Sequence, residues 1–184
     1  MHIERRDKMD STIKALEAIV EALKDSWYRI VGGLAVDGYV GHLTRSHSDV
    51  DVIILEEELD RVQEALRKNS HSFTLFPYKV RLLIDGVAVD LGRFQRSQEG
   101  YWLVTLPEHK WPVDLLEKEE VTLEGIQFKV PSKEFLLSTR LMDRRRSKAS
   151  HDRQILKRMG VSTQIAKEHR FPYNLLTLRA EQGE

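Results

Sequence analysis

The chain has 184 residues, of which 41% are hydrophobic and 32% are charged, a composition typical of a folded globular domain and not of a disordered chain. Its 29 lysines and arginines balance its 29 aspartates and glutamates, and this zero net charge argues against a protein that coats nucleic acid, which would need a basic surplus. The absence of cysteine excludes disulfides, thiolate metal sites and cysteine catalysis.

The length fits one domain, which we expect to span 1–184, with a core at about 11–160 and a tail at 161–184 that no pattern assigns to an element. Residues 1–10 alternate in charge and lack the apolar stretch of a signal peptide, and no apolar run is long enough to cross a bilayer. We therefore expect a cytoplasmic protein, a monomer or a homodimer, without a membrane partner.

The first part of the chain alternates between helical and strand patterns. Apolar residues recur at helical spacing after the candidate caps Asp10 and Ser11, and β-branched or aromatic runs indicate strands. In chain order the patterns predict a helix, a strand, a short helix, a second strand and a third helix, at 11–25, 27–31, 34–39, 50–55 and 56–69. The short helix is expected to end near Gly41, and 42–48 to form a polar loop.

Two hairpins and two helices are expected in the second part. The turn pairs Asp85-Gly86 and Glu124-Gly125 separate four strands, at 79–84, 87–91, 120–123 and 126–130. Pro131-Ser132 can cap a helix over 133–146, and a last helix over 151–159 is ended by Gly160. Helices mixed with antiparallel hairpins predict an α+β fold with a mixed β-sheet flanked by helices and a C-terminal helical portion.

Two aspartates at the start of the second strand are the first indication of chemistry. Asp49 and Asp51 are two residues apart, so their side chains share a face of the strand. Two adjacent carboxylates repel each other, a divalent cation relieves this, and oxygen ligands favour Mg²⁺ or Mn²⁺ over zinc. If the strand that ends near Asp90 lies beside them, three carboxylates converge and can hold two metals. The alternative is that Asp49 caps a turn and Asp51 is merely exposed on an edge strand.

A diglycine turn precedes these acids. Gly32-Gly33 lies between a strand and a helix, where glycine lets backbone N–H groups approach a phosphate and the helix N-terminus favours anions. A plain tight turn uses the same residues, and the pair matches neither the dinucleotide-binding nor the P-loop pattern. Together with the acids, the turn predicts a metal-chelated nucleoside triphosphate.

The segment from the turn to the acids resembles a known superfamily, the DNA polymerase β-like nucleotidyltransferases. The match consists of Gly32-Gly33-x-Ala35-Val36-Asp37 followed by Gly41-x-x-Thr44-Arg45-x-His47-x-Asp49-Val50-Asp51. Within the superfamily it is most similar to the small antibiotic-modifying branch, which includes lincosamide nucleotidyltransferases and aminoglycoside 2″-adenylyltransferases. The specific match covers about 20 residues, and fifteen residues separate Gly33 from Asp49, in keeping with this branch.

The resemblance implies a nucleotidyltransferase-like sheet in which Gly32 and Gly33 hold a triphosphate and Asp49 and Asp51 hold magnesium. Asp90 matches the third acid, which completes the metal site and helps to deprotonate the acceptor hydroxyl. The implied co-substrate is ATP or another nucleoside triphosphate. Its nucleoside monophosphate, AMP when ATP is the donor, would move to a hydroxyl of a small molecule while pyrophosphate leaves.

The C-terminal half departs from the family pattern. Arg146, Lys148 and Asp152 fit a basic helix of the family, but Ala149 replaces an aspartate and Arg140 stands near the place of a lysine. The basic stretch either offsets triphosphate charge or forms a solvated helix face, and it includes Arg140, Arg144, Arg145, Arg146 and Lys148.

Several single residues have two interpretations. Arg45 either contacts phosphate through its forked guanidinium or ties down its loop through a salt bridge. Asp37 is expected to pack or cap, and His47 to form hydrogen bonds within the loop. If Asp90 is not the third acid, Glu99 and Asp114 are the next candidates.

Two other functions compete with a small-molecule transferase. One is an inactive, antitoxin-like partner with the same fold, but such proteins typically carry Gly-Ser and a shorter spacer, and all three acids are present here. The other is an enzyme that modifies a protein or a tRNA end. The neutral overall charge makes a nucleic-acid partner unlikely.

Overall fold

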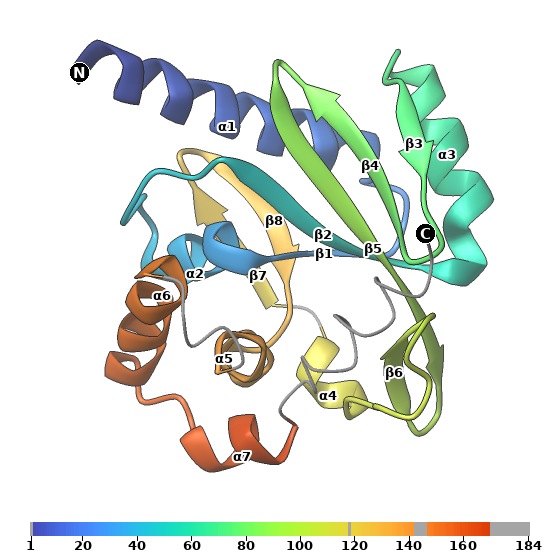
Figure 1. Cartoon of the computed structure of the whole chain (residues 1–184), viewed down its shortest axis with the longest axis vertical. Coiled ribbons are helices and arrows are strands. Elements are labelled where there is room, and N and C mark those ends of the chain that lie inside the picture. Colours follow the sequence, from blue (N-terminus) through green and yellow to red (C-terminus); the bar gives the residue numbers. More distant parts are fainter. Residues whose placement is uncertain (1, 118, 142–146, 170–184) are drawn as a thin grey trace.

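The computed structural model describes residues 2–117, 119–141 and 147–169. Six strands are β1 (Tyr28–Val31), β2 (Asp49–Leu55), β3 (Phe73–Leu75), β4 (Lys79–Ile84), β5 (Val87–Ser97) and β6 (Gly100–Leu103). They form one mixed sheet in the order β1-β2-β5-β4-β3, with β6 paired to β5 (Figure 1). Only the pair β2 and β5 is parallel within this sheet. Strands β7 (Glu119–Leu123) and β8 (Ile126–Val130) form a separate hairpin.

The helices lie on both sides of the sheet (Figure 1). They are α1 (His2–Ala22), α2 (Gly32–Val40), α3 (Leu59–Lys68), α4 (Val113–Leu116), α5 (Lys133–Arg140), α6 (Ser147–Arg158) and α7 (Thr163–Glu168), with a 3₁₀ turn η1 at Glu56–Glu58. Helix α1 packs against β2 and β5, whereas α2 contacts β1, β2, α5 and α6. Among the described residues, no helix combines the length and the apolar character needed to cross a membrane.

The strand alternation sorts the sheet into an apolar face and a polar face. The buried apolar residues that the three central strands place on one face are Val50, Val52, Ile54, Val80, Leu82, Ile84, Val87, Val89 and Leu91. With Leu16 and Ile19 of α1 and Leu23 just after it, they belong to the main core, and each such side chain contributes about 1.5–3 kcal/mol of burial free energy. The residues between them, Asp49, Asp51, Arg81 and Asp90, therefore emerge on the opposite face.

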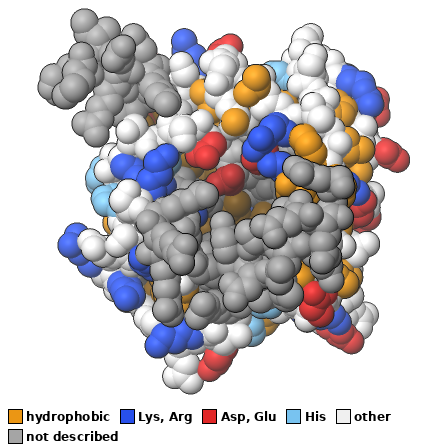
Figure 2. Space-filling model, viewed as in Figure 1, with side chains coloured by type: hydrophobic (Ala, Val, Ile, Leu, Met, Phe, Trp, Pro, Cys, Tyr) orange, Lys and Arg blue, Asp and Glu red, His pale blue; other side chains and the backbone are white. Residues whose placement is uncertain are grey.

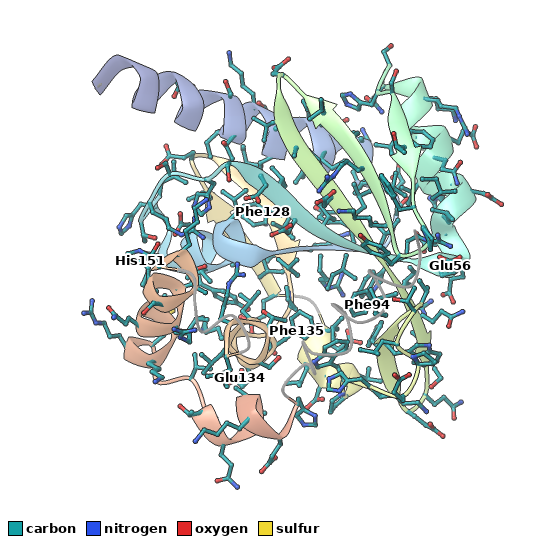
Figure 3. All side chains as sticks on the ribbon, in the orientation of Figure 1. Glu56, Phe94, Phe128, Glu134, Phe135 and His151 are labelled. Atoms are coloured by element: carbon teal, nitrogen blue, oxygen red, sulfur yellow. The ribbon has the colours of Figure 1, made fainter. Side chains whose placement is uncertain are left out.

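On that opposite face an aromatic cluster fixes α5 beneath the sheet. The indole ring of Trp111 lies between Phe94 of β5 and Phe135 of α5, with ring centroids 5.5 Å away in each case. Figure 3 shows the two phenylalanines in the middle of the molecule. This packing holds the C-terminal helices next to the polar face.

The expected α+β class, mixed sheet and C-terminal helical portion are confirmed. Both turn pairs have a left-handed backbone, with φ of 50° and 78° at Asp85 and Gly86, and 49° and 82° at Glu124 and Gly125. These two-residue turns match the twist of the strands that they join.

Some boundaries differ from the prediction. Helix α1 begins at His2 and not at residue 11, because residues 2–10 contain no helix breaker and Asp10 and Ser11 lie inside the helix instead of capping it. The helix expected over 56–69 splits into η1 and α3. Strand β5 continues to Ser97, where it pairs with β6.

The C-terminal half also differs in detail. Helix α5 ends at Arg140 and α6 begins at Ser147, so the end predicted for the first of these helices falls partly on residues 142–146, outside the described residues. Four elements of three to six residues were not predicted, namely β3, β6, α4 and α7. Elements this short carry too few residues for a periodic pattern to be recognised.

Candidate functional site

Strands β2 and β5 bring the three predicted acids to one face of the sheet. The parallel register pairs Asp51 with Asp90, and Asp49 lies two residues upstream on the same face. On its other side Asp51 pairs with Val31, the residue immediately before the diglycine turn. The site is therefore built where the end of β1 meets the start of β2 and the middle of β5.

The charges of these carboxylates act on one another. The pKa of Asp51 is raised to about 6, first by burial and then by the neighbouring charges of Asp49 and Asp90. The cations of Arg140 and Lys79 act in the opposite direction. The cluster thus concentrates negative charge at a partly buried position, which is the condition that a divalent cation relieves.

Asp90 is held by two cations from β4. Arg81 donates from Nε to Oδ1 at 2.7 Å and from Nη2 to Oδ2 at 2.6 Å, and Lys79 donates to Oδ2 at 3.2 Å. Although partial burial acts to raise the pKa of Asp90, the hydrogen bonds from Arg81 and Lys79 outweigh it and the pKa lies below its ordinary value. We call Lys79, Arg81 and Asp90 the β4–β5 clamp.

The donor chemistry fits magnesium, but the present side-chain arrangement does not yet form a metal site. Within residues 2–117, 119–141 and 147–169, no three His, Cys, Asp or Glu side chains are arranged to hold a metal ion. Asp49, Asp51 and Asp90 offer the carboxylate oxygens that Mg²⁺ prefers. Both oxygens of Asp90 are bonded to Arg81, so in a site with three carboxylates a metal and Arg81 compete for this side chain.

Gly32 lies against the acid cluster. Its φ of +73° is in the left-handed region, and a Cβ at this position would lie 2.7 Å from Oδ2 of Asp51 and 3.3 Å from Nη2 of Arg140. Only glycine combines this backbone conformation with such close neighbours. The turn, one of the acids and a cation of α5 therefore meet at one point.

Gly33 is equally confined. A Cβ there would overlap the guanidinium of Arg45 and would lie 2.6 Å from Cε1 of His47. Both glycines are buried. The turn where the sequence analysis expects a phosphate is thus closely packed by charged side chains, and its local charge is positive at Arg45 and Arg140.

Asp152 of α6 joins the two arginines that line this turn. It is 1% exposed and accepts from Nε and Nη2 of Arg45 at 3.0 Å each, while Nε of Arg140 lies 3.1 Å from its Oδ2. Arg45 therefore forms a salt bridge that holds its loop in place. This is the structural role considered for it in the sequence analysis, as opposed to a contact with phosphate. Arg140 and Asp152 were considered in the sequence analysis but not placed among the site residues.

The loop between α2 and β2 is held by a second network around Asp37. Its carboxylate accepts from the backbone N–H of Thr44 at 3.1 Å and from the Thr44 hydroxyl at 2.5 Å, and contacts Nε2 of His47 at 2.7 Å. Arg45 donates to Nδ1 of His47 at 3.1 Å, so Nε2 carries the hydrogen that Asp37 accepts. His151 of α6 lies beside this loop, 3.1 Å from the Thr44 hydroxyl (Figure 3). Asp37 and His47 thus have the structural contacts expected of them.

The alternative third acids lie elsewhere. Glu99 is in the turn between β5 and β6 and pairs with Lys110, and Asp114 is in the first turn of α4. Of the basic stretch, Lys148 contacts the Ser48 hydroxyl at 3.2 Å. The stretch also includes three arginines outside the described residues, Arg144, Arg145 and Arg146.

Acidic and basic side chains lie close together on one face of the molecule. Figure 2 shows acidic side chains near the middle of this face and Lys or Arg side chains to either side of them. A site of this kind presents carboxylates for a metal between cations that can meet a polyphosphate.

Known proteins share the family and the fold of this chain. A family model described as aminoglycoside-2″-adenylyltransferase matches residues 14–135. Among curated proteins there is no match. The fold is similar to the solution structure of the antibiotic-resistance factor ANT(2″)-Ia, with a TM-score of 0.69 and 15% identity over 95% of this chain and 97% of that one.

Two further solved structures share the fold. ANT(2″)-Ia in complex with adenylyl-2″-tobramycin has a TM-score of 0.64 and 15% identity, over 94% of this chain and 99% of that one. The lincomycin-bound lincosamide antibiotic adenylyltransferase LnuA has a TM-score of 0.59 and 17% identity, over 78% of this chain and 95% of that one. The resemblance inferred from the turn and the acids is confirmed, as is the nucleotidyltransferase-like fold.

Proposed function

The chain belongs to the aminoglycoside-2″-adenylyltransferase family, and on this basis we propose that it transfers a nucleoside monophosphate, AMP from ATP, to a hydroxyl of a small molecule. The observation that carries the proposal is the position of Asp51, which lies between Asp90 on one side and the diglycine turn on the other. Acids for a metal and a cationic turn for a polyphosphate are the two parts that nucleotidyl transfer needs.

In this proposal Asp49, Asp51 and Asp90 hold magnesium, or manganese in its place. The bound metal would neutralise triphosphate charge and stabilise the leaving pyrophosphate. Gly32 and Gly33 hold the triphosphate through their backbone. The guanidinium of Arg140, close to Gly32 and paired with a buried carboxylate, is positioned to add positive charge for the same phosphates.

The proposed reaction is an in-line displacement. The acceptor hydroxyl oxygen forms a bond to the α-phosphorus, the bond from that phosphorus to the bridging oxygen of the β-phosphate breaks, and pyrophosphate leaves. The hydroxyl proton passes to the carboxylate of Asp90, which gives it up to water afterwards. Asp90 lies beside β4 with its side chain 23% exposed, so that it borders on solvent.

The acceptor class is proposed from the relatives. One was solved with adenylyl-2″-tobramycin and another with lincomycin, which supports a small molecule as the acceptor here. The zero net charge of this chain supports the same class over a tRNA end.

A pyrophosphate-release screen tests the proposal. Nucleoside triphosphates are crossed with aminoglycosides, lincosamides and common hydroxylated metabolites, with and without Mg²⁺. We expect release that depends on the metal and on at least one acceptor, and that is lost in Asp49→Asn and Asp51→Asn while the exposed control Asp60→Asn retains it. Turnover in the two site variants equal to that of the unmodified protein would refute the metal assignment.

The variant Asp90→Asn distinguishes an effect on the chemical step from an effect on nucleotide binding. We expect this variant to lower turnover more than nucleotide affinity, because Asp90 is the proposed proton acceptor and only one of three ligands. Nucleotide affinity is measured by calorimetry and turnover by pyrophosphate release. A variant with unchanged turnover would move the third acid to another residue.

A further inference from the structure

Strand β4 brings two cations to the carboxylate that the proposed function assigns to the metal. Arg81 is 48% exposed and Lys79 16%, and both are bonded to Asp90, which is 23% exposed. The contact from Arg81 is forked, with one guanidinium nitrogen on each carboxylate oxygen. A forked pair of this kind is the strongest arrangement that an arginine and a carboxylate adopt.

The hairpin makes this contact a fixed feature of the fold. The two-residue turn Asp85-Gly86 sets the pairing of β4 with β5, and in this pairing Arg81 stands directly opposite Asp90 while Lys79 is opposite Gly92. The ammonium group of Lys79 reaches diagonally to Oδ2 of Asp90, at 3.2 Å. The cations therefore meet Asp90 through the register of the hairpin and not through a chance surface rotamer.

The two cations and a metal compete for the same carboxylate. Asp90 already accepts one bond at Oδ1 and two at Oδ2, which leaves one lone pair of Oδ1 for a metal, and the positive charges of Arg81 and Lys79 repel a cation at that position. On the far side of Asp90, Asp51 experiences the charges of Asp49 and Asp90 together. Three acids without a counter-ion would be destabilised by this repulsion.

We propose that Lys79 and Arg81 are an internal counter-ion for Asp90 that competes with the metal, holding the third carboxylate in the metal-free protein and releasing it when the metal binds. The proposal rests on the proposed function, because it concerns the same metal site. Arg81 thereby lowers the affinity of the site for a free divalent cation. The metal binds more weakly because part of its binding free energy is used to break the forked pair.

Titration with Mn²⁺ in the absence of nucleotide tests this competition, with free Mn²⁺ followed by its electron paramagnetic resonance signal. We expect Arg81→Gln to bind Mn²⁺ about three- to tenfold more tightly than the unmodified protein, the range set by the loss of one ion pair to a partly exposed carboxylate. Arg81→Lys, which keeps the charge and loses the fork, should give a smaller gain. Unchanged or weaker binding in both variants would overturn the proposal.

A double-mutant cycle distinguishes a specific contact of Arg81 with Asp90 from a general electrostatic effect of one positive charge on Mn²⁺ affinity. In Asp90→Asn the carboxylate for which the cations and the metal compete is gone, so adding Arg81→Gln should bring little further gain. The matched control is Arg96→Gln, which removes an arginine of similar exposure, 44%, that pairs with Glu57. A gain in Arg81→Gln that persists in the Asp90→Asn background, or that Arg96→Gln equals, would contradict the proposal.

The same titration distinguishes this proposal from the proposed function. If Asp49→Asn and Asp51→Asn bind Mn²⁺ as well as the unmodified protein does, the metal assignment and the proposed function fail. If those two variants lose Mn²⁺ and Arg81→Gln changes nothing, the function stands and the competition alone is wrong. Circular dichroism of each variant verifies that it is folded, and Lys79→Gln replaces any variant of Arg81 that is not.

Discussion

Asp51 is a single residue whose ionised side chain lowers the stability of the folded protein. Its pKa of about 6, against an ordinary value of 3.8, is raised first by burial and then by the charges of Asp49 and Asp90. The ionised side chain is therefore less stable in the folded protein than in the unfolded chain. Such a position is kept ionised at neutral pH at the expense of folding free energy, as is common where a charged group has a functional task.

The sign of this effect predicts a pH-dependent stabilisation in Asp51→Asn. Between pH 3.8 and 6 the folded protein binds more protons at Asp51 than the unfolded chain, so its stability falls as the pH rises and stays lower above pH 6. With a chelator present, we expect Asp51→Asn to be more stable by about 1–3 kcal/mol at pH 8 and equal near pH 4. Urea unfolding at both pH values measures this, and equal stability at pH 8 would contradict the assigned environment.

Gly32 allows a second prediction at this scale. Alanine there meets both a left-handed φ and the oxygen of Asp51 at 2.7 Å, whereas alanine at Gly41 meets a φ of +86° with no atom within 4 Å. We expect Gly41→Ala to cost about 1 kcal/mol of unfolding free energy and Gly32→Ala at least twice as much. Urea unfolding of both variants compares them. Equal losses would mean that the turn is not packed against the acid.

At the scale of elements, Asp152 connects α6 with the loop after α2 and with the end of α5. Its two arginine partners, Arg45 and Arg140, are 16% and 20% exposed, so all three charges are largely removed from water. Removing one member of such a group leaves the others without compensation. The helix α6 is therefore positioned by charge as well as by packing.

We expect Asp152→Asn to lower the free energy of unfolding by about 2–4 kcal/mol. The control is Glu64→Gln in α3, whose pair with Lys68 is exposed at 64% and 72% and should contribute little to stability because water and salt screen it. Chemical unfolding of the two variants measures the difference. A loss in Asp152→Asn no larger than in Glu64→Gln would show that the arginines are not held by this carboxylate.

The hairpin of β4 and β5 shows which contacts can be predicted from a sequence. Because the Asp85-Gly86 turn has two residues, pairing proceeds outward from Ile84 and Val87 and places Arg81 opposite Asp90. The sequence analysis identified this hairpin but did not follow its register to the cation. The signal for the β4–β5 clamp was therefore present in the pattern.

Other contacts were not accessible in this way. The parallel pairing of Asp51 with Asp90 depends on β3, β4 and α3 between them, and was expected only on condition that the strands are neighbours. Arg45 and Asp152 are 107 residues apart in the chain, and no local pattern relates them. Tertiary packing decides such pairs, whereas turns and alternation decide local ones.

At the scale of the whole molecule, the site lies between the polar face of the sheet and the helices next to that face. The apolar face of β2, β4 and β5 packs towards α1, and the polar face looks towards α2, α5 and α6 (Figure 1). The acids come from strands β2 and β5, whereas Arg140 comes from α5 and Arg45 from the loop after α2. The packing of these helices against the sheet therefore sets the distance between the proposed metal site and the proposed phosphate site.

A crystal of the protein grown with Mn²⁺ and a non-hydrolysable ATP analogue would test the central claim most directly, through the anomalous scattering of manganese. We expect an anomalous peak in contact with carboxylate oxygens of Asp49, Asp51 and Asp90, with the triphosphate extending towards Gly32. Nucleotide bound with no manganese at these carboxylates, or manganese bound only elsewhere, would contradict it.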